Sequence, residues 1–244
     1  MKTDRIQNEV QHGEEIAANA VNIWGWGSPA GKVRAERRAA YFIQHGCLTV
    51  GKKVLEIGCG TGEFTKKIAS SGADITAIDI SPDLLEVARK TTPNVNVRFH
   101  IQNVEKLGFE DGSFDVVIGS SILHHLNLNP ALKEIYRVLK IQGGVVFTEP
   151  NMLNPQIWME RNITFIRKLT NNSPDETAFI RWGLKKEFIN LGFKNVSIRP
   201  FDFLHPFTPS MLIPFISNIG NLVESIPLAR EIAGSLLIYA LKEQ

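Results

Sequence analysis

Short apolar runs and amphipathic segments alternate along the middle of the chain. The apolar runs are rich in valine and isoleucine and are bounded by glycine, proline or polar residues, as β-strands often are. The segments between them space their apolar residues at helical intervals. The expected strands are 53–58, 74–80, 96–103, 111–121 and 143–150, and the expected helices are 62–72, 81–91 and 129–140. This alternation predicts an α/β fold with a doubly wound, mostly parallel sheet.

Both ends of the chain depart from this alternation. Helical patterns at 8–22 and 32–46 precede the first expected strand. The elements expected after Pro150 are a helical insertion at 151–170, a helix at 177–193, strands at 195–203 and 235–243, and an apolar stretch at 206–230. We therefore expect a seven-stranded sheet with helical insertions after strand five and between strands six and seven.

This division also predicts the domain organisation. At roughly one domain per 150 residues, a chain of 244 residues is one large domain or two small ones. We expect a single domain over 1–244. It consists of an N-terminal helical lid (1–46), a ligand-binding core (47–151) and a cap of insertions and last strands (152–244).

The composition excludes some classes of protein. The chain is 43% hydrophobic and 21% charged, which is ordinary for a globular protein, and its net charge of +2 is too small to indicate nucleic-acid binding. Its two cysteines, Cys47 and Cys59, do not form a disulfide framework and suit a reducing compartment. The N-terminus lacks the apolar core of a signal peptide, and no run reaches the roughly 18 apolar residues of a spanning helix. We expect a cytoplasmic protein without a membrane-spanning segment.

The stretch VLEIGCGTGEFT (54–65) is the first candidate for binding chemistry. Gly58, Gly60 and Gly62 follow an expected strand at every second position, so the spacing differs from the G-x-G-x-x-G of dinucleotide-binding sites. The carboxylate of Glu63 would also oppose a pyrophosphate at the start of a helix. This motif disfavours a nicotinamide or flavin dinucleotide but leaves it open.

Two acids near these glycines indicate another kind of ligand. Asp79 ends the second expected strand, where a carboxylate can accept hydrogen bonds from two ribose hydroxyls. Glu56 stands inside the first strand and can hold an ammonium group, directly or through water. Glycines let the backbone pass close to a ligand without Cβ clashes. A ligand with an adenosine, a carboxylate and a cation fits these residues better than a dinucleotide.

With these residues considered together, the chain resembles the class I S-adenosylmethionine-dependent methyltransferases, in particular the small-molecule group that includes ubiquinone- and menaquinone-biosynthesis-like enzymes. The resemblance covers about residues 50–151. Its motifs are VLEIGCGTGEF (54–64), AIDIS (77–81), HIQNVEKLGFEDGSFDVVIGSSILHHL (100–126) and YRVLKIQGGVVFTEPN (136–151). The resemblance implies S-adenosyl-L-methionine as the cofactor, S-adenosyl-L-homocysteine as the product and an antiparallel last strand.

The resemblance also implies which residues bind the cofactor. The family's acidic glycine motif, its ribose-binding acid and its adenine-binding pair all have counterparts, and the first residues beyond the fourth strand face the cofactor. The predicted residues are Glu56, Gly58, Cys59, Gly60, Thr61, Gly62, Asp79, Ile80, Asn103, Val104, Ser120 and Ser121. Asn103 departs from the family, which usually has aspartate at this position. Its side chain keeps an acceptor oxygen and adds N–H donors. For Cys59 we expect a packing role without redox chemistry.

The candidates for catalysis follow the fourth and fifth strands. Methyl transfer from a sulfonium mainly requires that donor and acceptor be aligned, but an O–H or N–H acceptor must also lose its proton. His124 and His125 are candidate bases, although adjacent residues on a regular element point different ways, so we expect at least one to be structural. Glu149 and Asn151 end the fifth strand, where a substrate contact and a structural hydrogen bond are both open.

The N-terminal region carries candidate lid and substrate residues. Trp24 and Trp26 flank Gly25 in a loop, and we weigh ordinary packing against a lid that closes over the cofactor. The arginines Arg34, Arg37 and Arg38 share one helical face. Two hypotheses stay open for that face: it is a solvated surface, or it is an anion site for the substrate.

The insertions are the most individual part of the sequence. Residues 157–169 are amphipathic and basic, and 205–229 are strongly apolar. They suit a cap with its apolar face buried on the sheet, the pocket wall for an apolar acceptor, a homodimer face or peripheral contact with a membrane. The remaining histidines lack zinc-ligand spacing, so no metal is expected.

We conclude from the sequence that the chain is a methyltransferase acting at O, N or C of a small, partly apolar molecule. One alternative is a binding or scaffold protein that keeps the fold without activity, and another is a dinucleotide-dependent oxidoreductase. A nucleic-acid substrate is not expected, because the chain lacks a basic stripe with interleaved aromatics. Protein targets stay open.

Overall fold

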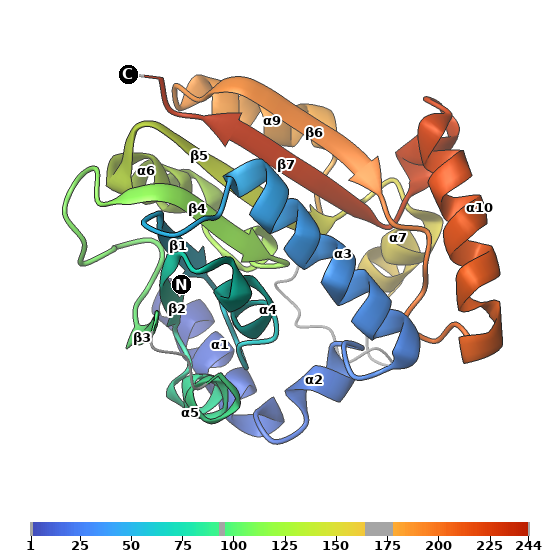
Figure 1. The fold of residues 1–244 in the computed structure, drawn as a ribbon, viewed down its shortest axis with the longest axis horizontal. Helices are drawn as coiled ribbons and strands as arrows, with labels where there is room; N and C mark the ends of the chain where they lie inside the picture. Colours follow the sequence, from blue (N-terminus) through green and yellow to red (C-terminus); the bar gives the residue numbers. More distant parts are fainter. Residues whose placement is uncertain (1, 93–95, 164–177, 244) are drawn as a thin grey trace.

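A seven-stranded sheet forms the centre of the computed structural model, which describes residues 2–92, 96–163 and 178–243. The strand order is β3-β2-β1-β4-β5-β7-β6 (Figure 1). The strands are β1 (Lys53–Ile57), β2 (Asp74–Asp79), β3 (Val97–Ile101), β4 (Phe114–Ser120), β5 (Leu139–Pro150), β6 (Lys194–Phe201) and β7 (Ser235–Leu241). The strands from β1 to β5 pair in parallel, and β7 is antiparallel to both β5 and β6. The predicted α/β sheet and its antiparallel last strand are therefore confirmed.

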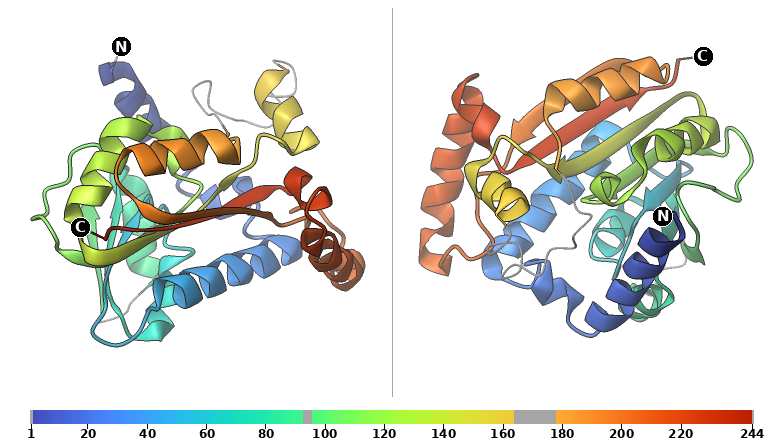
Figure 2. Two further views of the ribbon diagram at one scale, coloured as in Figure 1. Left: turned by 90° about the horizontal axis from the view of Figure 1, so that it is seen from above. Right: turned by 180° about the vertical axis from the view of Figure 1, so that it is seen from behind.

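Helices cover both faces of the sheet (Figure 2). One face packs against α3 (Pro29–Gly46), α4 (Thr65–Ile68) and α5 (Pro82–Thr91), through buried apolar residues such as Phe42, Ile68 and Leu85. The other face packs against α6 (Leu128–Val138) and α9 (Arg181–Asn190). The central strands β1, β4 and β5 are thus buried on both sides, which explains why they are nearly continuous apolar runs in the sequence.

The helix predicted at 62–72 is much shorter in the structure. Gly62 has a φ of +78°, which a right-handed helix cannot accommodate. The helix α4 therefore begins only at Thr65, and a 3₁₀ turn, η1 (Ala69–Ser71), continues it. The residues before Thr65 instead form a turn that leaves the glycine backbone at the carboxyl edge of the sheet.

Two helices precede α3. The helix α1 (Lys2–Ile16) packs against α5, and α2 (Ala20–Ile23) leads into the tryptophan loop. The predicted helical lid is thus present as secondary structure, although its first helix begins earlier than the pattern at 8–22 indicated.

The insertions differ from the sequence prediction. The helix expected at 151–170 is α7 (Pro155–Asn162), and residues 164–170 lie outside the described residues. The apolar stretch forms α10 (Ile213–Ser225) between the 3₁₀ turns η3 (Ser210–Leu212) and η4 (Ala229–Ile232).

The helix α10 does not bury its apolar face on the sheet. Phe215 is 63% exposed and Leu222 is 66% exposed, whereas Gly220 and Glu224 are buried. The reason is its placement beside the end of β6 (Figure 1), where the small and polar side of the helix makes the contact. No helix in the described ranges is both long and apolar enough to cross a membrane.

Candidate active site

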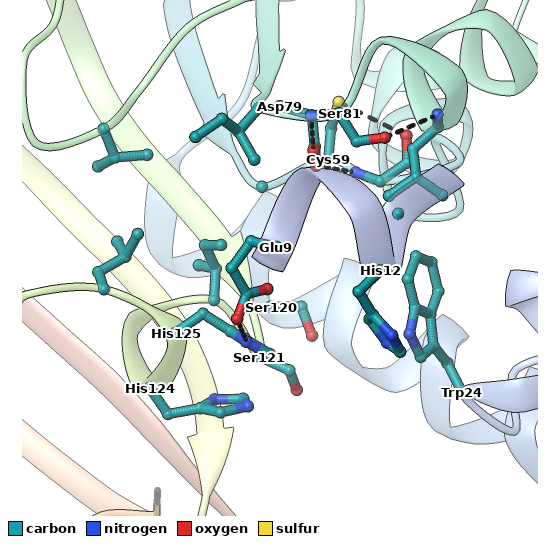
Figure 3. A pocket seen from close by; sticks show the side chains of 18 of the residues that line it. Glu9, His12, Trp24, Cys59, Asp79, Ser81, Ser120, Ser121, His124 and His125 are labelled. Carbon is teal, nitrogen blue, oxygen red and sulfur yellow. Dashed lines mark hydrogen bonds and ion pairs between the residues drawn. The ribbon is translucent and has the colours of Figure 1, made fainter. Parts of the chain in front are cut away.

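A pocket of about 370 Å³ opens at the carboxyl ends of β1, β2 and β4 (Figure 3). In open α/β sheets this edge is where ligands bind. The helix α1 and the tryptophan loop cover the pocket, and the turn after β4 closes one side. The structure brings together most of the residues predicted to bind a cofactor: Gly58, Cys59, Gly60, Asp79, Ile80, Asn103, Val104, Ser120 and Ser121.

The glycine turn is shaped for a close ligand. Gly58 and Gly60 have φ values of +63° and +51°, a backbone conformation that favours glycine. A Cβ added at Gly60 would lie 2.9 Å from the ring of Trp24. The turn is therefore a narrow cradle between the sheet edge and this tryptophan.

Asp79 ties this turn to the start of α5. Its Oδ2 accepts a hydrogen bond from the backbone N–H of Gly60 at 2.8 Å, and its Oδ1 accepts one from Ser81 at 2.9 Å. Burial raises the pKa of Asp79, and these two N–H donors offset part of that rise. The carboxylate thus stands at the pocket with a fixed orientation.

Glu56 lies behind the glycine turn and is not part of the pocket lining. It is 2% exposed, and its Oε2 makes no hydrogen bond of good geometry, although the nearby Thr65 hydroxyl lowers its pKa. Burial, with a smaller effect of the Asp79 charge, raises the pKa of Glu56 to about 8. A ligand that carries an ammonium group would lower this pKa and favour the ionised carboxylate, so such a ligand fits the buried oxygen.

The titration of Glu56 leads to a testable change in stability. Its pKa is about 8 in the folded chain against 4.5 as a reference, so between these values the folded state binds more protons and the free energy of unfolding decreases as pH rises. Glu56→Gln removes this effect. We expect the melting temperature of the variant, relative to the unaltered protein, to increase from pH 5 to pH 8.

Thermal melting over this pH range checks the expectation. The exposed Glu110 is a matched control, since Glu110→Gln removes a carboxylate that is not buried. A difference between Glu56→Gln and the unaltered protein that stays constant with pH would contradict the raised pKa.

An apolar slot adjoins Asp79. Ile80, Leu84 and Val104 line it, and the last two are almost completely buried. Asn103 lies at its rim, where its Oδ1 accepts a hydrogen bond from the backbone N–H of Glu105 at 2.9 Å. The Oδ1 of Asn103 is therefore already used by the backbone, and any further hydrogen bond of this amide as a donor would come from its NH₂ group.

His124 lines the other side of the pocket, and its buried partner Glu149, a predicted catalytic residue, lies outside the pocket lining. The Oε1 of Glu149 accepts hydrogen bonds from the backbone N–H groups of Ile122 and Leu123, at 2.9 and 2.8 Å. Its Oε2 lies 2.7 Å from Nδ1 of His124. A carboxylate at Nδ1 favours the tautomer with its proton there and leaves Nε2 as an acceptor.

His125 is held by the N-terminal helix. Its Nδ1 lies 3.3 Å from Oε1 of Glu9, and both residues line the pocket with His12 (Figure 3). The ring centroids of His124 and His125 are 4.2 Å apart and both residues line the pocket, so the pair does not diverge as neighbours on a regular helix or strand would. The reason is that they lie on a 3₁₀ turn, η2 (Leu123–His125), and not on a regular helix or strand.

The pocket residues of α1 were not among the predicted site residues. Arg5 pairs with Glu105 across the pocket, and Glu9 contacts His125. Gly13 is the one signal that could have indicated this helix, because a glycine inside a helix often marks a close approach. A Cβ there would lie 2.5 Å from Oγ of Ser81, so the glycine allows α1 to pack on the start of α5.

Arg34 and Arg38, predicted as lid or substrate residues, do not line the pocket. Both guanidinium groups pair with Asp202, at 2.8 and 3.1 Å, and Arg37 pairs with Glu224. This face is therefore neither a solvated surface nor an open anion site. Its partners are Asp202, which directly follows β6, and Glu224 of α10, both more than 160 residues later in the chain.

Asn151 also serves the fold and not the pocket. It is 1% exposed, and its amide donates to the carbonyl oxygens of Glu231 and Ala233, both at 2.8 Å. Of the residues predicted for the cofactor, Glu56, Thr61 and Gly62 lie outside the pocket lining.

Trp24 and Trp26 both line the pocket. Trp26 is 8% exposed and packs edge-on against Phe64, with ring centroids 5.3 Å apart. Trp26 is thus packed, as one of the two predictions had it, while Trp24 lies beside Gly60, and closure of this loop as a lid stays a prediction. Within the described ranges, no three histidine, cysteine or carboxylate side chains are grouped so that they could hold a metal.

Comparison with known proteins agrees with this geometry. The chain matches the methyltransferase domain family over residues 55–147. It is 34% identical over 170 residues to an uncharacterized methyltransferase-like protein of Schizosaccharomyces pombe, covering 68% of this chain and 64% of that protein. It is 31% identical over 172 residues to demethylmenaquinone methyltransferase of Staphylococcus aureus, covering 62% of this chain and 71% of that protein.

Solved structures share the fold along most of the chain. A chain of the Haloferax volcanii complex between the Trm112 methyltransferase activator and its methyltransferase has a TM-score of 0.70 at 17% identity, covering 95% of this chain and 98% of that chain. Phosphoethanolamine N-methyltransferase 2 of Haemonchus contortus, solved with S-adenosyl-L-methionine, has a TM-score of 0.63 at 18% identity, covering 91% of this chain and 56% of that chain.

The family follows from sequence and fold together. The glycine turn, the acid that ends β2 and the antiparallel β7 all lie where the motifs predicted them. The identity to the curated relatives extends beyond the matched domain and over most of the Staphylococcus aureus enzyme. The chain belongs to the class I S-adenosylmethionine-dependent methyltransferases.

Proposed function

We propose that this methyltransferase transfers a methyl group to O, N or C of a small, partly apolar molecule in the pocket under α1. The observation that supports the proposal is the arrangement at the sheet edge, where one pocket is lined by the glycine cradle, Asp79 and His124, and His124 is held by the buried Glu149. One side offers a binding surface for a nucleoside with an amino-acid tail, and the other a fixed proton acceptor. This pairing supports transfer better than binding alone.

The first set of residues would hold the cofactor. S-adenosyl-L-methionine supplies an electrophilic methyl group on a sulfonium sulfur when it is bound. In our proposal Asp79 accepts hydrogen bonds from its ribose, Ile80 and Val104 enclose its adenine, and Glu56 attracts its ammonium group through the glycine turn. The buried Oε2 of Glu56, which makes no hydrogen bond of good geometry, supports the last assignment.

The second set of residues would receive the acceptor. His124, with Nδ1 directed at Glu149, presents Nε2 as the base for an O–H or N–H proton. Ile6, Ile16 and Leu126 line the same pocket and give it an apolar wall. Aligning donor and acceptor in this enclosed volume supplies the main part of the rate enhancement. For a carbon acceptor, the same base would remove the proton after transfer.

The division of the chain is part of the proposal. The lid is 1–46, the cofactor-binding core is 47–151, and 152–244 form the cap. None of the residues of α10 lines the pocket, so that helix supports a homodimer face better than a pocket wall. The cytoplasmic location rests on cysteine usage, and both Cys47 and Cys59 are free thiols.

Calorimetric titration with S-adenosylhomocysteine tests the proposal, with NADH as the competing ligand. We expect micromolar binding of S-adenosylhomocysteine alone, weakened about tenfold or more in Asp79→Asn, since a carboxylate that accepts two hydroxyls is worth over 1.4 kcal/mol. Binding of NADH alone would support the oxidoreductase instead. Binding without methyl transfer to any acceptor would support the scaffold.

The choice of acceptors to screen follows from the relatives. The name of the Staphylococcus aureus enzyme suggests demethylmenaquinone-type rings as a first group, and the apolar wall of the pocket is compatible with them. The measured product is S-adenosylhomocysteine, so one assay serves every acceptor.

A further inference from the structure

Two hydroxyl side chains meet at the ends of the central strands. Ser120 of β4 pairs in register with Thr148 of β5, and their hydroxyl oxygens are 2.9 Å apart. Thr148 is completely buried, whereas Ser120 is partly exposed and lines the pocket. The contact therefore links the sheet interior to the pocket.

Arg38 sets the direction of this hydrogen bond. Its Nη1 donates to Oγ1 of Thr148 at 3.2 Å, and its Nη2 donates to Asp202 and to Oγ of Ser235. Burial lowers the pKa of Arg38 to about 10, so it keeps its proton at neutral pH. A guanidinium has donors and no acceptor, so the threonine oxygen must accept and its own proton is free for Ser120.

The serine hydroxyl is thereby oriented. Because Ser120 accepts from Thr148, its own proton must point elsewhere, and the open direction is the pocket. A backbone hydrogen bond also joins the ends of β4 and β5. The N–H of Ser121, whose φ is +55°, donates to the carbonyl oxygen of Thr148 at 2.7 Å. A non-glycine residue in this conformation is uncommon and turns the chain sharply after Ser120.

The register places this donor beside the glycine turn. Glu56 of β1 pairs with Ile118 of β4, so two residues further along both strands Ser120 is level with Gly58. This is the end of the cradle where Glu56 would attract the ammonium group. The carboxylate of the same amino-acid tail needs a donor nearby, and the Ser120 hydroxyl lines the pocket at this level.

We propose that Arg38 and Thr148 are positioning residues that orient the Ser120 hydroxyl as a hydrogen-bond donor to the carboxylate of the cofactor. The relay rests on the proposed function, since it requires that the cofactor lie in the glycine cradle. It gives the buried arginine, which the sequence suggested as a substrate residue, a role that acts through two hydroxyl groups.

Calorimetry with two ligands tests the relay. S-adenosylhomocysteine carries the carboxylate, and 5′-methylthioadenosine lacks the whole amino-acid tail. We expect Thr148→Val and Ser120→Ala each to weaken S-adenosylhomocysteine about tenfold, as for a hydrogen bond to a charged group. Thr148→Ser keeps the hydroxyl and should bind within about twofold of the unaltered protein. Binding of 5′-methylthioadenosine should be the same in all four proteins, which also reports that they are folded.

The double variant separates the relay from two independent effects. If Thr148 acts through Ser120, Ser120→Ala combined with Thr148→Val binds no more weakly than Ser120→Ala alone. Additive losses, an unchanged affinity in Thr148→Val, or an equal loss for 5′-methylthioadenosine would each overturn the relay. Failure of the unaltered protein to bind S-adenosylhomocysteine would overturn the proposed function as well, so the two failures are distinct.

Discussion

Gly60→Val should lower the affinity for S-adenosylhomocysteine at least about 100-fold, a loss of roughly 2.7 kcal/mol. Gly60 has a φ of +51°, which costs an L-residue roughly 1–2 kcal/mol and costs a β-branched one more. The new side chain would also start 2.9 Å from the ring of Trp24, inside the cradle. Both the shape of the turn and the space for the ligand are lost. Calorimetric titration measures the effect.

Gly51→Val is the matched control for backbone strain. Gly51 has a φ of +86°, but a Cβ there has nothing within 4 Å. We expect both variants to melt at a lower temperature than the unaltered protein and only Gly60→Val to lose the ligand. If Gly51→Val lost it equally, strain and not the cradle would explain the result.

The glycine cradle could be predicted because its chemistry is local in sequence. Residues 54–65 contain the strand end and the turn, and Asp79 needs only the next strand beside the first. Parallel neighbours place their carboxyl ends at one edge, so spacing along the chain translates directly into proximity. The same argument explains why the order and type of the core elements could be predicted.

The covering helix and the arginine network could not be predicted in this way. The contacts of α1 with Glu105 and His125 join residues about a hundred positions apart, and those of Arg34 and Arg38 with Asp202 span even more. Three charges on one helical face look the same in sequence whether they face water or buried acids. The positions of the chain after β6 and of α10 decide between these environments.

The histidine pair illustrates a third limit. The prediction assumed a regular element after the fourth strand, where neighbouring side chains diverge. Glu149 instead accepts the backbone N–H groups of Ile122 and Leu123 and holds a tight turn there. The buried Glu149 of β5 thus determines the backbone conformation of the turn after β4. The spacing of residues within either motif does not indicate this contact.

Glu149→Ala should destabilise the fold strongly. Glu149 is completely buried and accepts hydrogen bonds from two backbone N–H groups and from His124. Each donor left without an acceptor costs roughly 1–3 kcal/mol. At about 2–4 °C per kcal/mol for a chain of this size, the melting temperature should decrease by about 10 °C or more. Thermal melting by circular dichroism measures the change.

Glu149→Gln should separate this structural role from catalysis. The amide oxygen can still accept the two backbone N–H groups, so we expect a melting temperature close to that of the unaltered protein and unchanged binding of S-adenosylhomocysteine. Its NH₂ group, however, faces Nδ1 of His124 and makes that nitrogen the acceptor. The proton moves to Nε2, and the base facing the pocket is lost. Methyl transfer to an O–H or N–H acceptor should then decrease about 10²- to 10⁴-fold.

Two measurements check this expectation. Nitrogen chemical shifts of histidine-labelled protein report the tautomer of His124 without any acceptor, and release of S-adenosylhomocysteine reports transfer. Glu134→Gln is the matched control, because Glu134 also accepts a backbone N–H, from Leu107 at 2.8 Å, but lies on α6 outside the pocket lining. If Glu149→Gln changed the tautomer and still transferred methyl groups at the unaltered rate, alignment alone would account for catalysis and His124 would not be the base.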